Sequence, residues 1–177
     1  PGPIAYAMFS PDGKRVFTLG WRGVKMTSGK DATKGVARLW DANTGKPLFD
    51  FVPMEIPQQW IRFSNDGERL LSLSATVTGN LQLYQLIASV YDATTLKPLS
   101  EPYRHTTCET GFGSLCFSAD GRRMLVTNGP DDRMPPDNDA DSRIFDTSTM
   151  KPIGKKITHG GRVPHGAFSP DGKSFLT

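Results

Sequence analysis

The sequence repeats one eight-residue phrase four times, and this repetition limits the fold more than any other feature. The phrase reads FSPDGKRV, FSNDGERL, FSADGRRM and FSPDGKSF, and it begins at Phe9, Phe63, Phe117 and Phe168. A second phrase recurs in step with it and reads ARLWDANTGKPL, ASVYDATTLKPL and SRIFDTSTMKPI. Successive copies of either phrase are 51 or 54 residues apart, so the chain is built from a unit of about fifty residues.

Each unit is predicted to consist of short antiparallel strands joined by tight turns. In the first phrase, β-prone runs flank a turn in which Pro and Asp suit the corners and Gly tolerates the left-handed position that follows. This glycine is present in all four copies, at Gly13, Gly67, Gly121 and Gly172. The pattern predicts a hairpin with a glycine bulge. The second phrase predicts a strand that ends on an aromatic–aspartate pair, then a turn and a further strand; the pairs are Trp40–Asp41, Tyr91–Asp92 and Phe145–Asp146.

FSPDG followed about thirty residues later by LWDANTGKPL resembles the WD40 repeat, and the resemblance covers the whole chain. It is similar above all to the WD40 arrays of large bacterial proteins. The resemblance implies an all-β fold, in which four-stranded antiparallel blades (strands a to d) form a β-propeller. FSPDG then marks the a–b turn, and the aromatic–aspartate pair ends strand c.

The number of repeats predicts an open arc rather than a closed ring. A closed propeller typically has about four to eight blades, whereas this chain holds about three and a half. We therefore expect a single repeat region over residues 1–177 that is cut from a larger propeller. The expected blades span about residues 4–52, 58–104 and 113–158, with an incomplete blade at 164–177.

The units depart from the family pattern in a way that bears on their stability. The family often joins a His before strand a, an Asp before strand c and the strand-c Trp by hydrogen bonds. His159 and Asp139 stand at the expected offsets, but Phe145 has no indole N–H to donate. Lys34 and Gln85 replace the aspartate in the first two units. Because no unit holds the full set, we expect the blades to depend more on apolar packing.

The units are longer than the usual WD40 period of about 40–45 residues, and the surplus lies between strands b and c, at residues 20–36, 74–89 and 128–142. The WD40 arrangement implies that these insertions lie on one face, where repeat proteins carry function. The first insertion is basic and contains Trp21, Arg22 and Lys25, which are candidate partner-binding residues. The second is predicted to extend strands b and c as a longer hairpin.

The third insertion is acidic and offers two interpretations. Asp137, Asp139 and Asp141 alternate as in the start of a calcium loop, but the glycine and the distal glutamate of such loops are absent. A solvated acidic loop is therefore favoured, and no metal or cofactor is expected.

Three residues before each repeat phenylalanine, the chain places Tyr6, Trp60, Ser114 and His165. This position begins strand a at the rim of the central channel, so Tyr6, Trp60 and His165 could contact a peptide. Packing between blades requires large side chains equally and is the favoured alternative. Arg62 stands apart, because a charge on an innermost strand requires a partner.

We predict a non-catalytic protein–protein interaction scaffold that binds through the face of the insertions. The alternative is the propeller domain of an enzyme, either TolB- or peptidase-like or kinase-associated. TolB- and peptidase-like propellers generally lack the WD-TGKPL phrase, and the chain has no GxSxG motif. The expected partners are a protein or peptide and the remaining blades of the parent propeller.

Composition limits the other classes of partner. The net charge of +3 comes without a dense Lys/Arg stripe, so nucleic acid is disfavoured, although Trp21 in a basic loop leaves that alternative open. No apolar run reaches the roughly 18 residues of a membrane span. Cys108 and Cys116 form no CxxC pair. A reducing compartment, and hence a cytoplasmic location, is expected.

Overall fold

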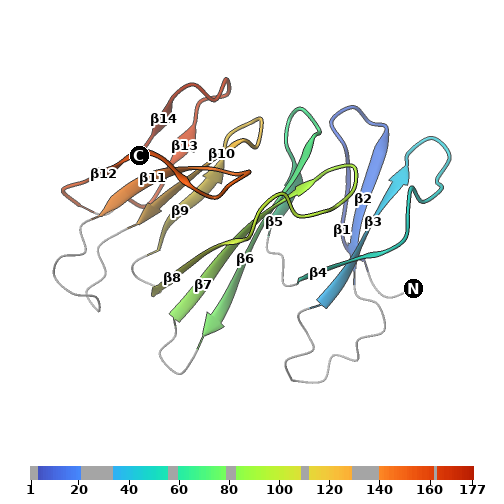
Figure 1. Cartoon of the computed structure of the whole chain (residues 1–177), viewed down its shortest axis with the longest axis horizontal. Coiled ribbons are helices and arrows are strands. Elements are labelled where there is room, and N and C mark those ends of the chain that lie inside the picture. Colours follow the sequence, from blue (N-terminus) through green and yellow to red (C-terminus); the bar gives the residue numbers. More distant parts are fainter. Residues whose placement is uncertain are drawn as a thin grey trace.

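The computed structural model describes residues 4–20, 34–55, 60–78, 83–108, 112–128, 140–161 and 163–177. These residues form strands and turns and contain no helix. The strands make three four-stranded antiparallel sheets and one two-stranded sheet, which we call blades 1 to 4 in chain order. Figure 1 shows the blades side by side along the long axis of the molecule.

Each blade is built from strands that are consecutive in the sequence. Blade 1 contains β1 (Ile4–Phe9), β2 (Arg15–Gly20), β3 (Lys34–Asp41) and β4 (Val52–Glu55). Blade 2 contains β5 (Trp60–Phe63), β6 (Arg69–Thr78), β7 (Leu83–Asp92) and β8 (Tyr103–Cys108). Blade 3 contains β9 (Phe112–Phe117), β10 (Arg123–Asn128), β11 (Asp141–Asp146) and β12 (Pro152–Thr158). Blade 4 contains only β13 (Ala167–Phe168) and β14 (Phe175–Leu176).

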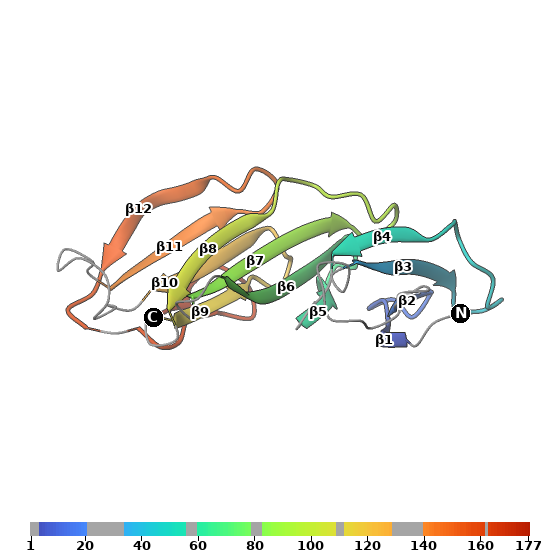
Figure 2. The same ribbon diagram turned by 90° about the horizontal axis from the view of Figure 1, so that it is seen from below.

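The blades form a partial β-propeller that is open rather than closed. In Figures 1 and 2, blade 1 and blade 4 lie at opposite ends of the arc. Strands a to d are hydrogen-bonded in sequence order within each complete blade. The prediction of an all-β open arc is confirmed.

The apolar core lies between the blades. One cluster joins Phe17, Leu19 and Leu39 of blade 1 to residues of blade 2, and a second joins blade 2 to blade 3. The alternation of a strand explains how one blade serves both clusters, because successive side chains point to opposite faces. Leu70 enters the first cluster and Leu71 the second, and both are fully buried.

The a–b turns have the predicted geometry. In the first copy, the Gly13 N–H donates to the Ser10 carbonyl at 2.9 Å, and Gly13 has a φ of 69°. The glycines at 67, 121 and 172 also have positive φ, a conformation that glycine adopts with little strain because it has no Cβ. The c–d turns differ, because Gly45 in blade 1 is replaced by Leu96 and Met150, which keep positive φ values of 56° and 51°.

The second insertion is an extended hairpin, as predicted. β6 and β7 have ten residues each and pair from Arg69↔Asp92 to Thr78↔Leu83. Figure 1 shows these two strands running beyond the other strands of the arc at its lower edge. The a–b turn between β5 and β6 lies at the opposite edge, so the b–c ends and the a–b turns belong to different faces of the arc.

Arginines at the start of strand b connect successive blades. Arg15 of blade 1 donates from Nη2 to the Gly67 carbonyl at 2.9 Å and from Nη1 to the Ala93 carbonyl at 2.8 Å, both in blade 2. Arg123 of blade 3 likewise donates to the Gly172 carbonyl of blade 4. We call this contact the arginine latch.

The junction between blades 2 and 3 lacks this latch. The hydroxyl of Thr147 donates to the Gly121 carbonyl at 2.7 Å, and the Ser100 hydroxyl donates to the Thr147 carbonyl at 3.0 Å. These are the two carbonyls that correspond to the acceptors of Arg15. Arg69 stays within its own blade, where its Nη1 lies 3.8 Å from a carboxylate oxygen of Glu68.

Candidate functional site

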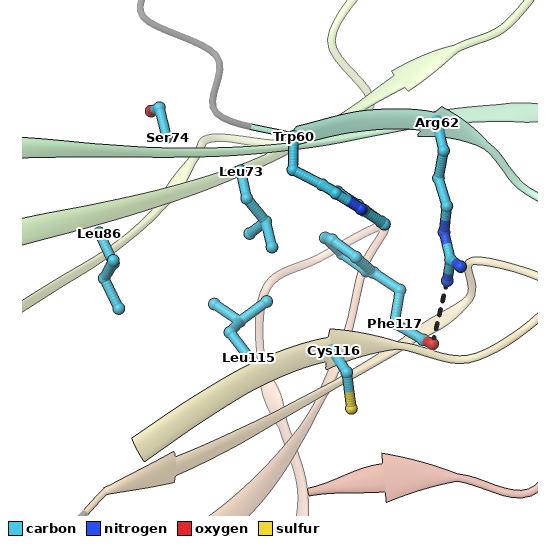
Figure 3. A pocket seen from close by; sticks show the side chains of 8 residues that line it. All are labelled: Trp60, Arg62, Leu73, Ser74, Leu86, Leu115, Cys116 and Phe117. Atoms are coloured by element: carbon cyan, nitrogen blue, oxygen red, sulfur yellow. Dashed lines mark hydrogen bonds between the residues drawn. The ribbon is translucent and has the colours of Figure 1, made fainter. Parts of the chain in front are cut away.

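A pocket of about 370 Å³ lies between blades 2 and 3. Its residues come from β5, β6 and β7 on one side and from β9 on the other, so its walls are set by how two blades face each other. The lining residues are Trp60, Arg62, Leu73, Ser74, Leu86, Leu115, Cys116 and Phe117. Figure 3 shows Leu73 and Leu86 across the pocket from Leu115.

Two aromatic rings form the part of the pocket nearest the innermost strands. The Trp60 and Phe117 rings are nearly parallel, at 7°, with their centroids 6.1 Å apart. Trp60 begins β5 and Phe117 ends β9, so the stacked pair spans the junction (Figure 3). Such offset stacking adds to the apolar burial of both rings.

Arg62 places a positive charge beside these rings. Its guanidinium carbon lies 4.7 Å from the centroid of the Trp60 ring, a cation–π arrangement. Its Nη2 reaches the Phe117 carbonyl only at 3.5 Å, the dashed line in Figure 3. Partial desolvation of the guanidinium beside the rings lowers the pKa of Arg62, although the group remains charged at neutral pH. The site therefore combines an apolar wall with one exposed cation.

Cys116 does not supply a nucleophile to this pocket. Burial raises the pKa of its thiol above the ordinary value. The thiolate is the reactive form of cysteine, so the raised pKa keeps the group unreactive at neutral pH. In Figure 3 the sulfur points away from Trp60 and Phe117. The pocket is suited to binding rather than to covalent chemistry.

One serine–histidine contact elsewhere also has no catalytic geometry. Ser142 Oγ and His159 Nε2 share a hydrogen bond of 2.9 Å, and the backbone N–H of His159 donates to the Ala140 carbonyl. Ser142 is fully buried, so no substrate reaches its hydroxyl. The pair attaches the segment after β12 to β11. Among the residues that the structure describes, no group of three or more metal-ligating side chains is present.

The three described members of the predicted partner-binding set do not form one cluster. Tyr6 packs against the core between blades 1 and 2, Trp60 lies between blades 2 and 3, and His165 is exposed just before β13. Trp21, Arg22 and Lys25 lie outside the described residues, as does Asp139. Of these three described residues, Trp60 alone lines the pocket.

The aromatic–aspartate pairs organise the c–d turns. Asp41 Oδ1 accepts hydrogen bonds from the backbone N–H groups of Asn43 and Thr44 and from the Thr44 hydroxyl. The bond from the Thr44 backbone and that from its hydroxyl hold the pKa of Asp41 below its ordinary value. Asp92 and Asp146 accept equivalent bonds in their own turns.

The aromatic members of these pairs differ between blades. Trp40 Nε1 donates to the Thr18 hydroxyl at 2.8 Å. Phe145 has no donor and instead meets Tyr103 of blade 2, with ring centroids 4.8 Å apart. Blade 3 thus replaces an internal hydrogen bond with packing against its neighbour, which agrees with the expected reliance on apolar contacts.

Sequence reasoning missed the arginine latch, the Thr18 acceptor and most of the pocket. The latch had a visible signal, because the residue two positions after the turn glycine is Arg15, Arg69 and Arg123 in the first three copies. Its acceptors are backbone carbonyls of the next blade, which no residue pattern identifies. The leucines of the pocket look like ordinary strand residues until two blades are placed together.

The described part of the chain contains no helix that could span a membrane. No family model matches the sequence, and no curated protein matches it. Solved structures do match. An acylaminoacyl peptidase from Pyrococcus horikoshii has a TM-score of 0.55 at 14% identity, over 87% of this chain and 25% of that chain. This likeness shows a shared fold.

Two further matches are propellers at a TM-score of 0.49 each. The Dos1 propeller is 15% identical over 97% of this chain and 38% of that chain. The β-propeller domain of the Trilobed protease from Pyrococcus furiosus, with an open velcro topology, is 14% identical over 90% of this chain and 43% of that one. The chain thus spans less than half the length of each of these three structures.

Proposed function

We propose that this chain is a WD40-like repeat region that serves as a non-catalytic scaffold within a larger propeller, binding a protein or peptide partner. The observation that carries the proposal is the inter-blade pocket, in which an exposed arginine adjoins stacked aromatic rings. Aromatic and arginine side chains dominate binding energy at protein interfaces. The WD40-like assignment is supported by the repeated turn glycines and by aspartates that organise each c–d turn.

The proposal places the partner on the face that carries the b–c connections. Loops on a rigid scaffold are the usual binding elements of repeat proteins, and the blades supply the rigidity through their shared cores. A non-catalytic role is favoured because the serine of the described serine–histidine pair is buried and the pocket thiol has a raised pKa.

Quantitative affinity capture with this chain tests the proposal. We expect a partner to be retained by the unmodified chain and lost by the double variant Trp21→Ala/Arg22→Ala, which alters the first b–c insertion. The matched control is Lys14→Ala/Lys46→Ala, which removes two exposed residues from the turns at the other face. The control should retain the partner. An identical set of captured proteins for all three chains would contradict the proposed face.

A further inference from the structure

We propose that the pocket between blades 2 and 3 binds a peptide segment in which a carboxylate side chain lies next to a large apolar side chain. This inference rests on the proposed function and specifies its partner. The juxtaposition that carries it is Arg62 beside the apolar wall formed by Trp60, Phe117 and the leucines of β6, β7 and β9.

Unlike six other described arginines, Arg62 has neither a nearby carboxylate nor a close hydrogen bond; Arg15 and Arg123 donate to carbonyls of the next blade. Four of them, Arg38, Arg69, Arg122 and Arg143, lie within 4.0 Å of a carboxylate oxygen. Among the described residues, Arg62 pairs with no carboxylate, and the one hydrogen bond of its side chain is the weak one to the Phe117 carbonyl. A guanidinium presents five donors in a fixed fork that fits a carboxylate. Most of these donors have no partner among the described residues and can bind a ligand.

The ring beneath the guanidinium fixes the direction of the open donors. Arg62 lies over the Trp60 ring, which is itself stacked on Phe117. The side chain is thus supported on one side, and less rotational freedom is lost when it binds an anion. The carboxylate of a ligand therefore has a positioned partner at the mouth of the pocket.

The remaining wall defines the second half of the ligand. Leu73 and Leu86 face Leu115 across a space of about 370 Å³, near the lower end of the range of roughly 300–1,000 Å³ for ligand pockets. Ser74 is the one hydroxyl side chain in this lining. This environment accepts an apolar side chain and disfavours a second charge, because an unpaired charge loses its hydration there.

The same chemistry disfavours other ligands. A cationic ligand would be repelled by Arg62, and a nucleic acid would meet one arginine where several phosphates require several cations. A short acidic–apolar segment satisfies both halves of the site at once.

The test uses four capped or free probes and nuclear magnetic resonance of the Trp60 indole N–H, assigned with Trp60→Phe. The probes are acetyl-Gly-Phe-Glu-Gly-amide, its Phe-Gln and Ala-Glu counterparts, and free 4-phenylbutanoate. We expect the Phe-Glu peptide to shift the Trp60 signal and to bind about tenfold more tightly than the Phe-Gln peptide, since charge-assisted hydrogen bonds are the stronger ones. The Ala-Glu peptide should lose a similar factor.

Variants separate the pocket from general charge effects. Arg62→Gln should abolish the preference for Phe-Glu over Phe-Gln, whereas Arg62→Lys should keep part of it. The matched control Arg143→Gln removes an exposed arginine from β11 and should keep the preference in full. Arg62 is exposed, so its replacement should leave the fold intact. The β-sheet circular dichroism of each variant verifies this before titration.

Each negative outcome has one meaning. Equal binding of the Phe-Glu and Phe-Gln peptides, an undiminished preference in Arg62→Gln, or binding of 4-phenylbutanoate without the peptides would overturn the inference. So would the absence of any shift. If Arg62→Gln keeps the preference for Phe-Glu but still captures the partner that Trp21→Ala/Arg22→Ala loses, the proposed function stands and only the ligand assignment is wrong.

Discussion

At the residue scale, the glycines of the a–b turns share a backbone conformation but meet different surroundings. Gly13 has a φ of 69°, and an added Cβ would have no neighbour within 4 Å. Gly121 has a φ of 66°, and an added Cβ would lie 3.1 Å from Ser64 Cβ and 3.0 Å from Leu71 Cδ2 of blade 2. Gly121 is therefore needed for blade packing as well as for the turn.

This difference predicts unequal effects of the same substitution. Gly13→Ala should destabilise the chain by about 1 kcal/mol, the cost of a positive φ for an L-residue. Gly121→Ala should cost about 1 to 3 kcal/mol more, because the methyl group overpacks the junction. Urea denaturation of both variants measures the difference. Equal losses would show that the junction relaxes and that packing plays no part at Gly121.

The c–d turns show where residue-level prediction stops. The phrase with Gly45 predicts a left-handed residue, but the copies with Leu96 and Met150 give no such indication. Leu96 is fully buried in the core between blades 1 and 2, and the burial of a leucine offsets the cost of its backbone conformation. A tertiary contact thus overrides a local preference, and the sequence alone does not reveal that contact.

At the element scale, the arginine latch connects the start of one strand b to the turns of the next blade. Arg15 makes hydrogen bonds to the Gly67 and Ala93 carbonyls and to the Thr94 hydroxyl, and it approaches the Phe63 ring at 5.8 Å. These contacts all cross the junction of blades 1 and 2. The latch should therefore contribute to the stability of the junction rather than of a single blade.

Substitution of the latch tests this contribution. Arg15→Gln should lower the free energy of unfolding by about 1.5 to 3 kcal/mol, because it removes charge-assisted bonds and leaves partly buried carbonyls without a donor. The matched control is Arg122→Gln, which removes an exposed pair with Glu68 at 3.4 Å and should cost about 1 kcal/mol or less. The contributions can be compared by chemical denaturation. Similar losses for both variants would reduce the latch to an ordinary surface contact.

Elements were predicted well where one strand pair decides the outcome. The repeat phrases predict the a–b hairpins, and alternation predicts the long β6–β7 hairpin, since both depend on neighbours in the chain. The pocket depends on two blades at once. Trp60 and Arg62 stand out in the sequence, but only the junction brings them to Leu115, Cys116 and Phe117.

At the scale of the whole molecule, the exposure of each repeat phenylalanine shows whether another blade packs against its side of the blade. Phe63 and Phe117 are 7% and 4% exposed, because a preceding blade packs against each of them. Phe9 occupies the same place in blade 1 and is 67% exposed, and Ile4 of the same strand is 64% exposed. No described blade covers this side of the arc. Counting repeats predicted the open arc, but the size of the uncovered apolar surface required the structure.

The uncovered face predicts self-association. The chain should show concentration-dependent association in sedimentation velocity, because exposed apolar sheet faces associate in water. Phe9→Glu should weaken the association at least about tenfold, the equivalent of burying one aromatic side chain. Leu48→Glu, which alters an exposed leucine in a c–d turn, serves as the control and should leave association unchanged. A monomer at all concentrations would contradict the prediction.

The latch also gives the array a polarity. Blade 1 gives its arginine to blade 2, and blade 3 gives its arginine to blade 4, always toward the later blade. Each such junction thus has a donor side and an acceptor side. In blade 4, Ser174 stands where the arginine would be. A unit joining before Phe9 would bring the arginine, whereas a unit joining after blade 4 would form its junction without one.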